Sequence, residues 1–179
     1  MNAGAYGSEI SNYLVSIKCI TLEGNEKNYL KEDLEFSYRY SNIPKNEIVV
    51  EAKFQFQTGD INEIKINKDK ASQSRRNNQP LQYRSAGSIF KNPKNGMAAG
   101  YLIDKAGLKG LKKGDAEIST KHANFIINHG SASSDNIIEL IKIIKAKVYD
   151  KFKVNLDLEV KLMGFTKEKL EGIAWKRGC

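Results

Sequence analysis

The sequence contains no run of 18 apolar residues among its 179 positions, so no transmembrane helix is expected. Its first seven residues lack both the basic start and the apolar run of a secretory signal peptide. These absences favour a protein that acts in the cytoplasm, without a membrane partner.

Cysteine is nearly absent as well. The chain has Cys19 and Cys179, which are far apart and lie near no histidine cluster. This spacing argues against a zinc site or a disulfide framework, and it favours reduced thiols in a cytosol. We therefore expect no metal site.

Arginine is scarce among the basic residues, although the net charge is +8. The lysines are scattered, and aromatic residues do not alternate with them as in a stacking platform for nucleic acid. The pattern favours a solvated, lysine-rich surface and no nucleic-acid partner. A basic nucleic-acid-binding protein is the alternative, and the same charge would also attract a polyanionic small molecule.

The composition, 40% hydrophobic and 28% charged, is that of a globular protein with one domain or two small ones. Apolar residues alternate over 13–21 and again over 47–57, which predicts two strands paired in one sheet. Residues 36–43 are expected to form an irregular crossing between them. Polar residues dominate 62–80, which predicts a polar helix or linker near a domain boundary.

The second half mixes helix and strand signals. We expect a helix over 97–106, a loop over 108–114 and a short buried strand over 123–128. Cap residues at 133–135 predict a second helix that ends near Phe152. Alternation over 154–162 predicts a final strand with Glu159 on its polar side. This mixture predicts the α+β class.

Residues 85–93 concentrate polar chemistry beside a turn. Gly87 allows a close approach of the main chain, and Ser88, Lys91 and Asn92 surround the apolar Phe90. Such a cluster suits a polar small molecule, although an ordinary glycine/proline turn explains the same residues.

Three other places could carry chemistry. Two glycines within residues 2–7 would let the main chain approach a flat cofactor, Arg39 lies between strands, and Glu159 is a carboxylate on a strand. Each also has a plain explanation as a glycine loop, a solvated arginine or an exposed carboxylate.

Taken in order, these segments resemble the UDP-N-acetylenolpyruvoylglucosamine reductase family. The likeness runs from Met1 to about Gly164, through NAGAYG (2–7), YRYS (38–41), AGSIFKNP (86–93), AGYLIDKAGLKG (99–110), HANFIIN (122–128) and LEV (158–160).

The resemblance implies a flavoenzyme of peptidoglycan precursor synthesis. FAD and NADPH would be its cofactors, and UDP-N-acetylglucosamine enolpyruvate would be reduced to UDP-N-acetylmuramate. It also implies the remainder of a PCMH-type FAD-binding domain over 1–65, a substrate-binding α+β domain over 66–165 and a charged tail over 166–179. A monomer is expected.

The resemblance also implies roles for particular residues. Arg39, Ser88 and Glu159 match the catalytic residues, with Ser88 as the proton donor. The implied cofactor contacts are Asn2, Ala3, Gly4, Ala5, Tyr6 and Gly7, and the implied substrate contacts are Lys91, Asn92 and His122.

Family members carry a flavin-binding portion before the position that matches Met1. We therefore expect this sequence to correspond to the C-terminal part of a reductase and to bind FAD weakly or not at all. The alternative function is a UDP-sugar-binding module without redox chemistry.

Overall fold

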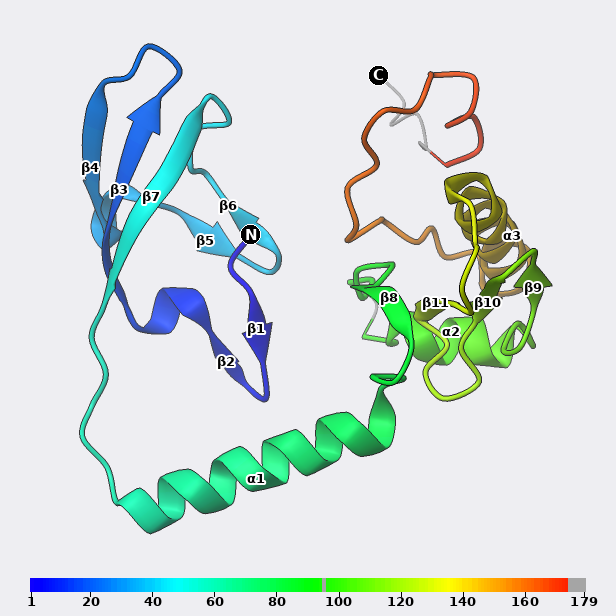
Figure 1. The fold of residues 1–179 in the computed structure, drawn as a ribbon, viewed down its shortest axis with the longest axis horizontal. Coiled ribbons are helices and arrows are strands. Elements are labelled where there is room, and N and C mark those ends of the chain that lie inside the picture. The colour runs from blue at the N-terminus through cyan, green and yellow to red at the C-terminus, as the bar shows by residue number, and fades with distance from the viewer. Residues whose placement is uncertain (95, 174–179) are drawn as a thin grey trace. The chain divides into compact units, whose positions relative to one another are not determined.

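The computed structural model describes residues 1–94 and 96–173, which fold into two compact units. Unit 1 spans Met1–Ala71 and unit 2 spans Ser72–Cys179 (Figure 1). Part of the expected charged tail, including Cys179, lies outside the described residues. No helix among the described residues has the length and apolar character needed to cross a membrane.

Unit 1 begins with a tight hairpin where the sequence predicted a loop. Strands β1 (Gly4–Ala5) and β2 (Ser8–Glu9) pair antiparallel around Tyr6 and Gly7, whose φ angles are +53° and +79°. Two successive left-handed residues match the right-handed twist of the flanking strands. A short 3₁₀ turn, η1 (Ile10–Asn12), follows.

The main sheet of unit 1 has the order β4–β3–β7, with bounds Glu26–Leu30, Leu14–Thr21 and Glu47–Phe54. The predicted pairing of the two long strands is confirmed, since β3 and β7 are antiparallel neighbours. Their register shifts between Lys18 and Cys19. The inner residues of β3 pack with Leu34 into a small core of Leu14, Ile17, Cys19 and Leu34.

The apolar side chains of β7 are exposed. Ile48, Val50 and Phe54 are 60%, 51% and 41% exposed, and Phe56 beyond the strand is 69% exposed. The alternation of β7 therefore predicts the strand correctly, and the apolar residues that it places on one face are exposed.

Residues 36–43 are more regular than predicted. After the 3₁₀ turn η2 (Lys31–Asp33), strands β5 (Phe36–Ser37) and β6 (Tyr40–Ser41) form a hairpin. The turn is the residue pair Tyr38 and Arg39.

The polar segment after β7 is a helix, α1 (Ile61–Asn78). Asp60 starts it, because its Oδ1 accepts hydrogen bonds from the backbone N–H groups of Asn62 and Glu63. None of its residues is buried, and Pro80 follows two residues after its end.

Unit 2 is built on an antiparallel sheet of order β8–β11–β10–β9. The strands span Arg84–Ser88, Phe125–Asn128, Ala116–Ile118 and Lys112–Lys113. Strand β9 lies within the segment predicted as a loop. Helices α2 (Ala99–Lys105) and α3 (Ser134–Phe152) pack against each other, and α3 also packs on β9 and β10. The core lies between these elements.

The predicted long helix is confirmed as α3. Ser133 caps its start, since Ser133 Oγ accepts a hydrogen bond from Asn136 N at 3.2 Å, and Asn136 Oδ1 accepts one from Ser133 N. Lys153, with a φ of +56°, ends it in the left-handed conformation.

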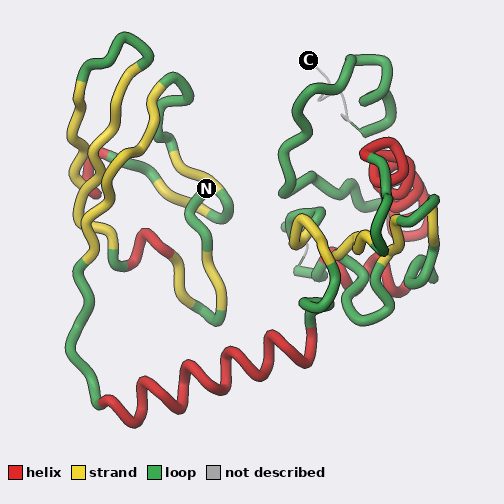
Figure 2. The backbone as a smooth tube through the Cα atoms, viewed as in Figure 1, coloured by secondary structure: helices red, strands yellow, loops and turns green. Residues whose placement is uncertain are grey.

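The predicted final strand over 154–162 is wrong. Only Leu158 forms a bridge, to Phe90, and Figure 2 draws the chain after α3 as loop. Leu156 is nevertheless buried. The alternation therefore marks a segment with one buried side, but this segment does not form the hydrogen-bond ladder of a strand. Glu159 consequently lies in an irregular segment rather than on a strand.

Candidate active site

Ser88 is the last residue of β8, and a β-bulge between β8 and β11 lies just before it. Ser88 pairs with Phe125 and Ser85 with Ile127, so three steps along β8 match two along β11. Gly87, one of the two residues that lie between these pairs, has a φ of +80°, a conformation that L side chains rarely adopt. The glycine therefore lets the strand bend just before the predicted proton donor.

Backbone hydrogen bonds hold the segment of Glu159 beside Ser88. Glu159 N donates to Ile89 O at 2.8 Å, and Lys91 N donates to Asp157 O at 2.8 Å. These bonds lie just beyond the end of β8. They explain why two residues 71 positions apart in sequence become neighbours.

Ser88 and Glu159 line one cavity of about 530 Å³ in unit 2. Arg75, Gln79 and Tyr83 also line it, and Arg75 Nε donates to Gln79 Oε1 at 3.2 Å. The cavity thus combines a hydroxyl, a carboxylate and a guanidinium. The sequence prediction missed Arg75, Gln79 and Tyr83, because no spacing signal separates them from other polar residues near the end of a helix.

A second cavity of about 300 Å³ shares Ser88 and adds two predicted substrate contacts, Asn92 and His122. Lys109 and Lys121 line it too, and the carboxylate of Asp104, which also lines it, forms an ion pair with Lys109 at 2.9 Å. Unit 2 therefore brings Ser88, Glu159, Asn92 and His122 to two cavities that meet at Ser88.

The ring of His122 is half-buried and stands edge-on to Phe125, with centroids 4.9 Å apart. Burial lowers the pKa of His122, so the neutral imidazole is favoured. Its Nδ1 accepts a hydrogen bond from Asn124 N at 3.3 Å, which leaves the ring proton on Nε2. The side chain can thus donate one hydrogen bond to a ligand without carrying charge.

Two of the predicted substrate contacts also have structural tasks. Asn92 Oδ1 accepts a hydrogen bond from Ala99 N at 3.0 Å, at the start of α2, where no side chain of the helix itself caps it. Lys91 contributes its backbone N–H to Asp157 O. Their contacts to a substrate remain predictions.

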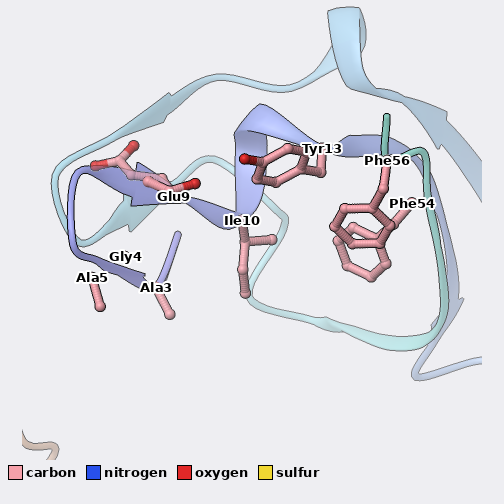
Figure 3. Close-up of a pocket in the computed structure, with 9 residues that line it drawn as sticks. Ala3, Gly4, Ala5, Glu9, Ile10, Tyr13, Phe54 and Phe56 are labelled. Atoms are coloured by element: carbon pink, nitrogen blue, oxygen red, sulfur yellow. The ribbon is translucent and has the colours of Figure 1, made fainter. Parts of the chain in front are cut away.

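Unit 1 contains an apolar cavity of about 380 Å³ at the predicted cofactor segment. Ala3, Gly4 and Ala5 line it on one side of Ile10, and aromatic rings line it on the other (Figure 3). The rings are those of Tyr13, Phe54 and Phe56, with the Tyr13 and Phe56 centroids 5.1 Å apart. Small residues opposite aromatic rings suit a flat, largely apolar ring system.

The other predicted cofactor residues flank this cavity along the chain. Tyr6 and Gly7 form the turn of the first hairpin. Asn2 is buried, its Nδ2 donates to Glu9 Oε2 at 2.6 Å, and its Oδ1 accepts from Ser11 N at 3.0 Å. Asn2 therefore fixes the shape of the glycine-rich segment.

Arg39 lies at the second position of the β5–β6 turn with a φ of +55°. Glycine or asparagine ordinarily takes such a position, so an arginine there carries backbone strain. Its Nη2 donates to Gly4 O at 3.4 Å, and its guanidinium lies 5.0 Å from the Tyr38 ring centroid. Unit 1 thus brings Arg39 to the glycine-rich segment. Its approach to Ser88 and Glu159, which belong to unit 2, remains a prediction.

Comparison with known proteins gives consistent results. The family model described as UDP-N-acetylenolpyruvoylglucosamine reductase, C-terminal domain, matches residues 79–163. A UDP-N-acetylenolpyruvoylglucosamine reductase of Geobacillus thermodenitrificans is 46% identical over 165 residues, which are 92% of this chain and 54% of that protein. The protein of the same name from Rickettsia canadensis is 38% identical over 92% of this chain and 55% of its own length.

A solved structure shares the fold as well. The crystal structure of UDP-N-acetylenolpyruvylglucosamine reductase from Thermus caldophilus superposes with a TM-score of 0.78 at 36% identity. The match covers 90% of this chain and 57% of that one. The chain therefore spans about half the length of the curated relatives it matches.

Proposed function

Because this chain belongs to the UDP-N-acetylenolpyruvoylglucosamine reductase family, we propose that it takes part in the reduction of UDP-N-acetylglucosamine enolpyruvate to UDP-N-acetylmuramate, with NADPH and FAD as cofactors. The single observation that carries the proposal is the cavity of unit 2 lined by both Ser88 and Glu159. A hydroxyl and a carboxylate from distant segments meet there, as the family resemblance implies.

Ser88 would supply the proton. When bound, FAD would pass a hydride from NADPH to the terminal carbon of the enolpyruvyl group. The hydroxyl of Ser88 would then protonate the neighbouring carbon, where negative charge develops. The bulge at Gly87 supports this role, because it directs Ser88 at the end of β8.

Glu159 and Arg39 would govern the charge that develops on the substrate. A guanidinium is a suitable partner for the substrate carboxylate as that group gains enolate character. Glu159 would have to be protonated or bridged, since a bare carboxylate would repel the same charge.

The residues of the unit 1 cavity fit the isoalloxazine ring of a flavin. Ala3 and Ala5 present methyl groups, Gly4 leaves its backbone uncovered, and Phe54 and Phe56 present exposed ring surface that a flat ring would cover. Aromatic stacking and apolar burial would both favour such a contact. The first hairpin and Asn2 would hold the main chain in place for it.

The second cavity of unit 2 would hold the polar part of the nucleotide sugar. Lys121 would supply positive charge for a diphosphate, Lys109 would add an ammonium group that is paired with Asp104, and His122 offers a neutral donor. Ser88 lines both cavities, so one extended ligand could reach the chemistry and the charged region together.

A UDP-sugar-binding module without redox chemistry is the second candidate. It is favoured by one observation: both cavities expected to hold the substrate are lined entirely by residues of unit 2. Binding could therefore persist when the flavin does not bind.

Calorimetry and a turnover assay on the full chain separate these functions. UDP-N-acetylglucosamine enolpyruvate should release or absorb heat on titration. Because we expect weak FAD binding, NADPH should be oxidised only when FAD is added in excess and that substrate is present. Binding without NADPH oxidation would support the module instead. Absence of both signals would contradict both functions.

A further inference from the structure

Lys145 is a buried cation that neither cavity uses. It lies on α3, only 9% of the residue is exposed, and buried Ile141, Ile144 and Val148 share its helix. Its Nζ donates a hydrogen bond to Leu156 O at 2.6 Å. Burying an ammonium group is costly unless it is well partnered, so a lysine here needs a reason.

The reason lies in the irregular segment after α3. This segment has one-sided burial but no strand ladder, so its backbone groups need partners from elsewhere. Leu156 is 1% exposed, and Lys145 donates to its carbonyl from the helix side. Without that ammonium group, the buried carbonyl would lose a charged donor, which is among the stronger hydrogen bonds in proteins.

The other side of the same segment is tied to the residues after Ser88. Asp157 O accepts from Lys91 N, and Glu159 N donates to Ile89 O, both at 2.8 Å. Lys145 therefore fixes the segment at Leu156, which lies one residue before Asp157 and three residues before Glu159. Helix α3 and the residues that follow β8 hold the segment between them.

We propose that Lys145 is a positioning residue that sets the place of Glu159 beside Ser88, an inference that rests on the proposed reductase function. Lys145 touches neither cavity and acts through the backbone of Leu156. Its long stem reaches the carbonyl from within the apolar face of α3. Burial lowers the pKa of Lys145 while Asp157 raises it, so the carboxylate of Asp157 helps to keep the ammonium charged.

Hydrogen exchange on the full chain tests the positioning directly. Lys145→Met keeps the volume and removes the donor, and Lys145→Arg keeps a charged donor. We expect Lys145→Met to speed exchange of the Lys91 and Glu159 amides about tenfold or more. The Ser119 amide, bonded to Phe125 O in the same unit, should change less than about twofold.

Lys147→Met is the matched control, because Lys147 is exposed on the same helix and receives the same substitution. It should leave all these amides unchanged, and Lys145→Arg should restore slow exchange at Lys91 and Glu159. Equal acceleration at Lys91, Glu159 and Ser119 would overturn the proposal, because it would indicate general destabilisation. Unchanged exchange at Lys91 and Glu159 would overturn it too.

A kinetic readout separates this inference from the proposed function. If the wild-type chain turns over, Lys145→Met should lower kcat about tenfold to a hundredfold with little change in KM, and Lys145→Arg should recover most of it. A rise in KM at constant kcat would contradict the positioning role. A wild-type chain without binding or turnover would contradict the function, and the exchange result would still decide whether Lys145 fixes the segment.

Discussion

At the residue scale, the side chain of Asn124 forms hydrogen bonds with the backbone of Phe90 that a neighbouring strand would otherwise provide. Its Nδ2 donates to Phe90 O at 2.8 Å, and its Oδ1 accepts from Phe90 N at 2.9 Å. Phe90 lies beyond the end of β8, and the side-chain amide of Asn124 gives both its N–H and its C=O a hydrogen-bond partner. The pairing fixes the backbone two residues after Ser88.

Asn124→Leu should therefore destabilise unit 2 by about 2 to 4 kcal/mol, since two buried backbone groups would lose their partners. The free energy of unfolding in urea measures the effect. Asn155→Leu, at an exposed position of the same unit, is the control and should cost little. Equal losses in the free energy of unfolding of the two variants would contradict a stabilising role for the Asn124 side chain.

Glu117 gives a prediction for pH. Burial raises the pKa of this carboxyl, but the hydrogen bonds from His129 at 2.7 Å and from Lys112 outweigh burial, so its pKa lies below the ordinary value. A carboxyl group whose pKa is lowered by folding stabilises the folded state at pH values above its unfolded pKa of about 4.3. This stability is lost as the pH falls through the folded pKa.

Unit 2 should lose less stability in Glu117→Gln than in wild type when the pH falls from neutral to below about 4.3. Thermal unfolding at a series of pH values checks this. Glu171→Gln, which changes an exposed carboxylate, should keep the wild-type pH dependence. The role of Glu117 would be excluded by a Glu117→Gln profile parallel to that of wild type.

At the element scale, α3 owes its start to a reciprocal cap between Ser133 and Asn136. Ser133→Ala should lower the free energy of unfolding by about 1 kcal/mol, because an N–H group at the helix start loses its acceptor. Chemical denaturation measures it. Ser131→Ala, two residues earlier and outside the helix, should stay within about 0.5 kcal/mol of wild type; a similar loss there would contradict the cap.

The element predictions from sequence succeeded where periodicity coincided with local end signals. Helix α3 has a 3.6-residue apolar repeat and a serine cap, and β3 has alternating burial at Ile17 and Cys19. The final strand failed because alternation measures which side is buried. It does not say whether a neighbouring strand offers hydrogen bonds, and beyond Ser88 only Phe90 forms a bridge to the segment.

The candidate site was predictable in part for the same reason. Ser88 and Glu159 were named from the family resemblance, and the cavity that both line agrees with it. Arg75, Tyr83 and Lys145 were missed, because the cavity or the hydrogen bond to which each belongs forms only when distant segments of the chain come together. No local pattern distinguishes a lysine that bonds a distant carbonyl from one on a solvated face.

At the scale of the whole molecule, the two units have cores of different size. Unit 1 relies on Leu14, Ile17, Cys19 and Leu34, whereas the core of unit 2 gathers residues from β10, β11, α2, α3 and the segments that follow β8 and α3. Buried apolar area drives stability, so the units should open with different free energies.

Amides of β3 should thus exchange at least about tenfold faster than amides of β11 in the intact chain. Hydrogen exchange followed by nuclear magnetic resonance measures both strands in one sample. Equal protection of the two strands would contradict this prediction and would indicate one cooperative molecule.

The central claim is that unit 2 binds the enolpyruvyl nucleotide sugar across the two cavities that meet at Ser88. Titration of the ¹⁵N-labelled chain with UDP-N-acetylglucosamine enolpyruvate, followed by amide chemical shifts, tests it most directly. Saturable shifts should centre on Ser88, Phe125 and Glu159 and extend to His122. Shifts confined to unit 1 or to scattered surface lysines, with these amides unmoved, would contradict the claim.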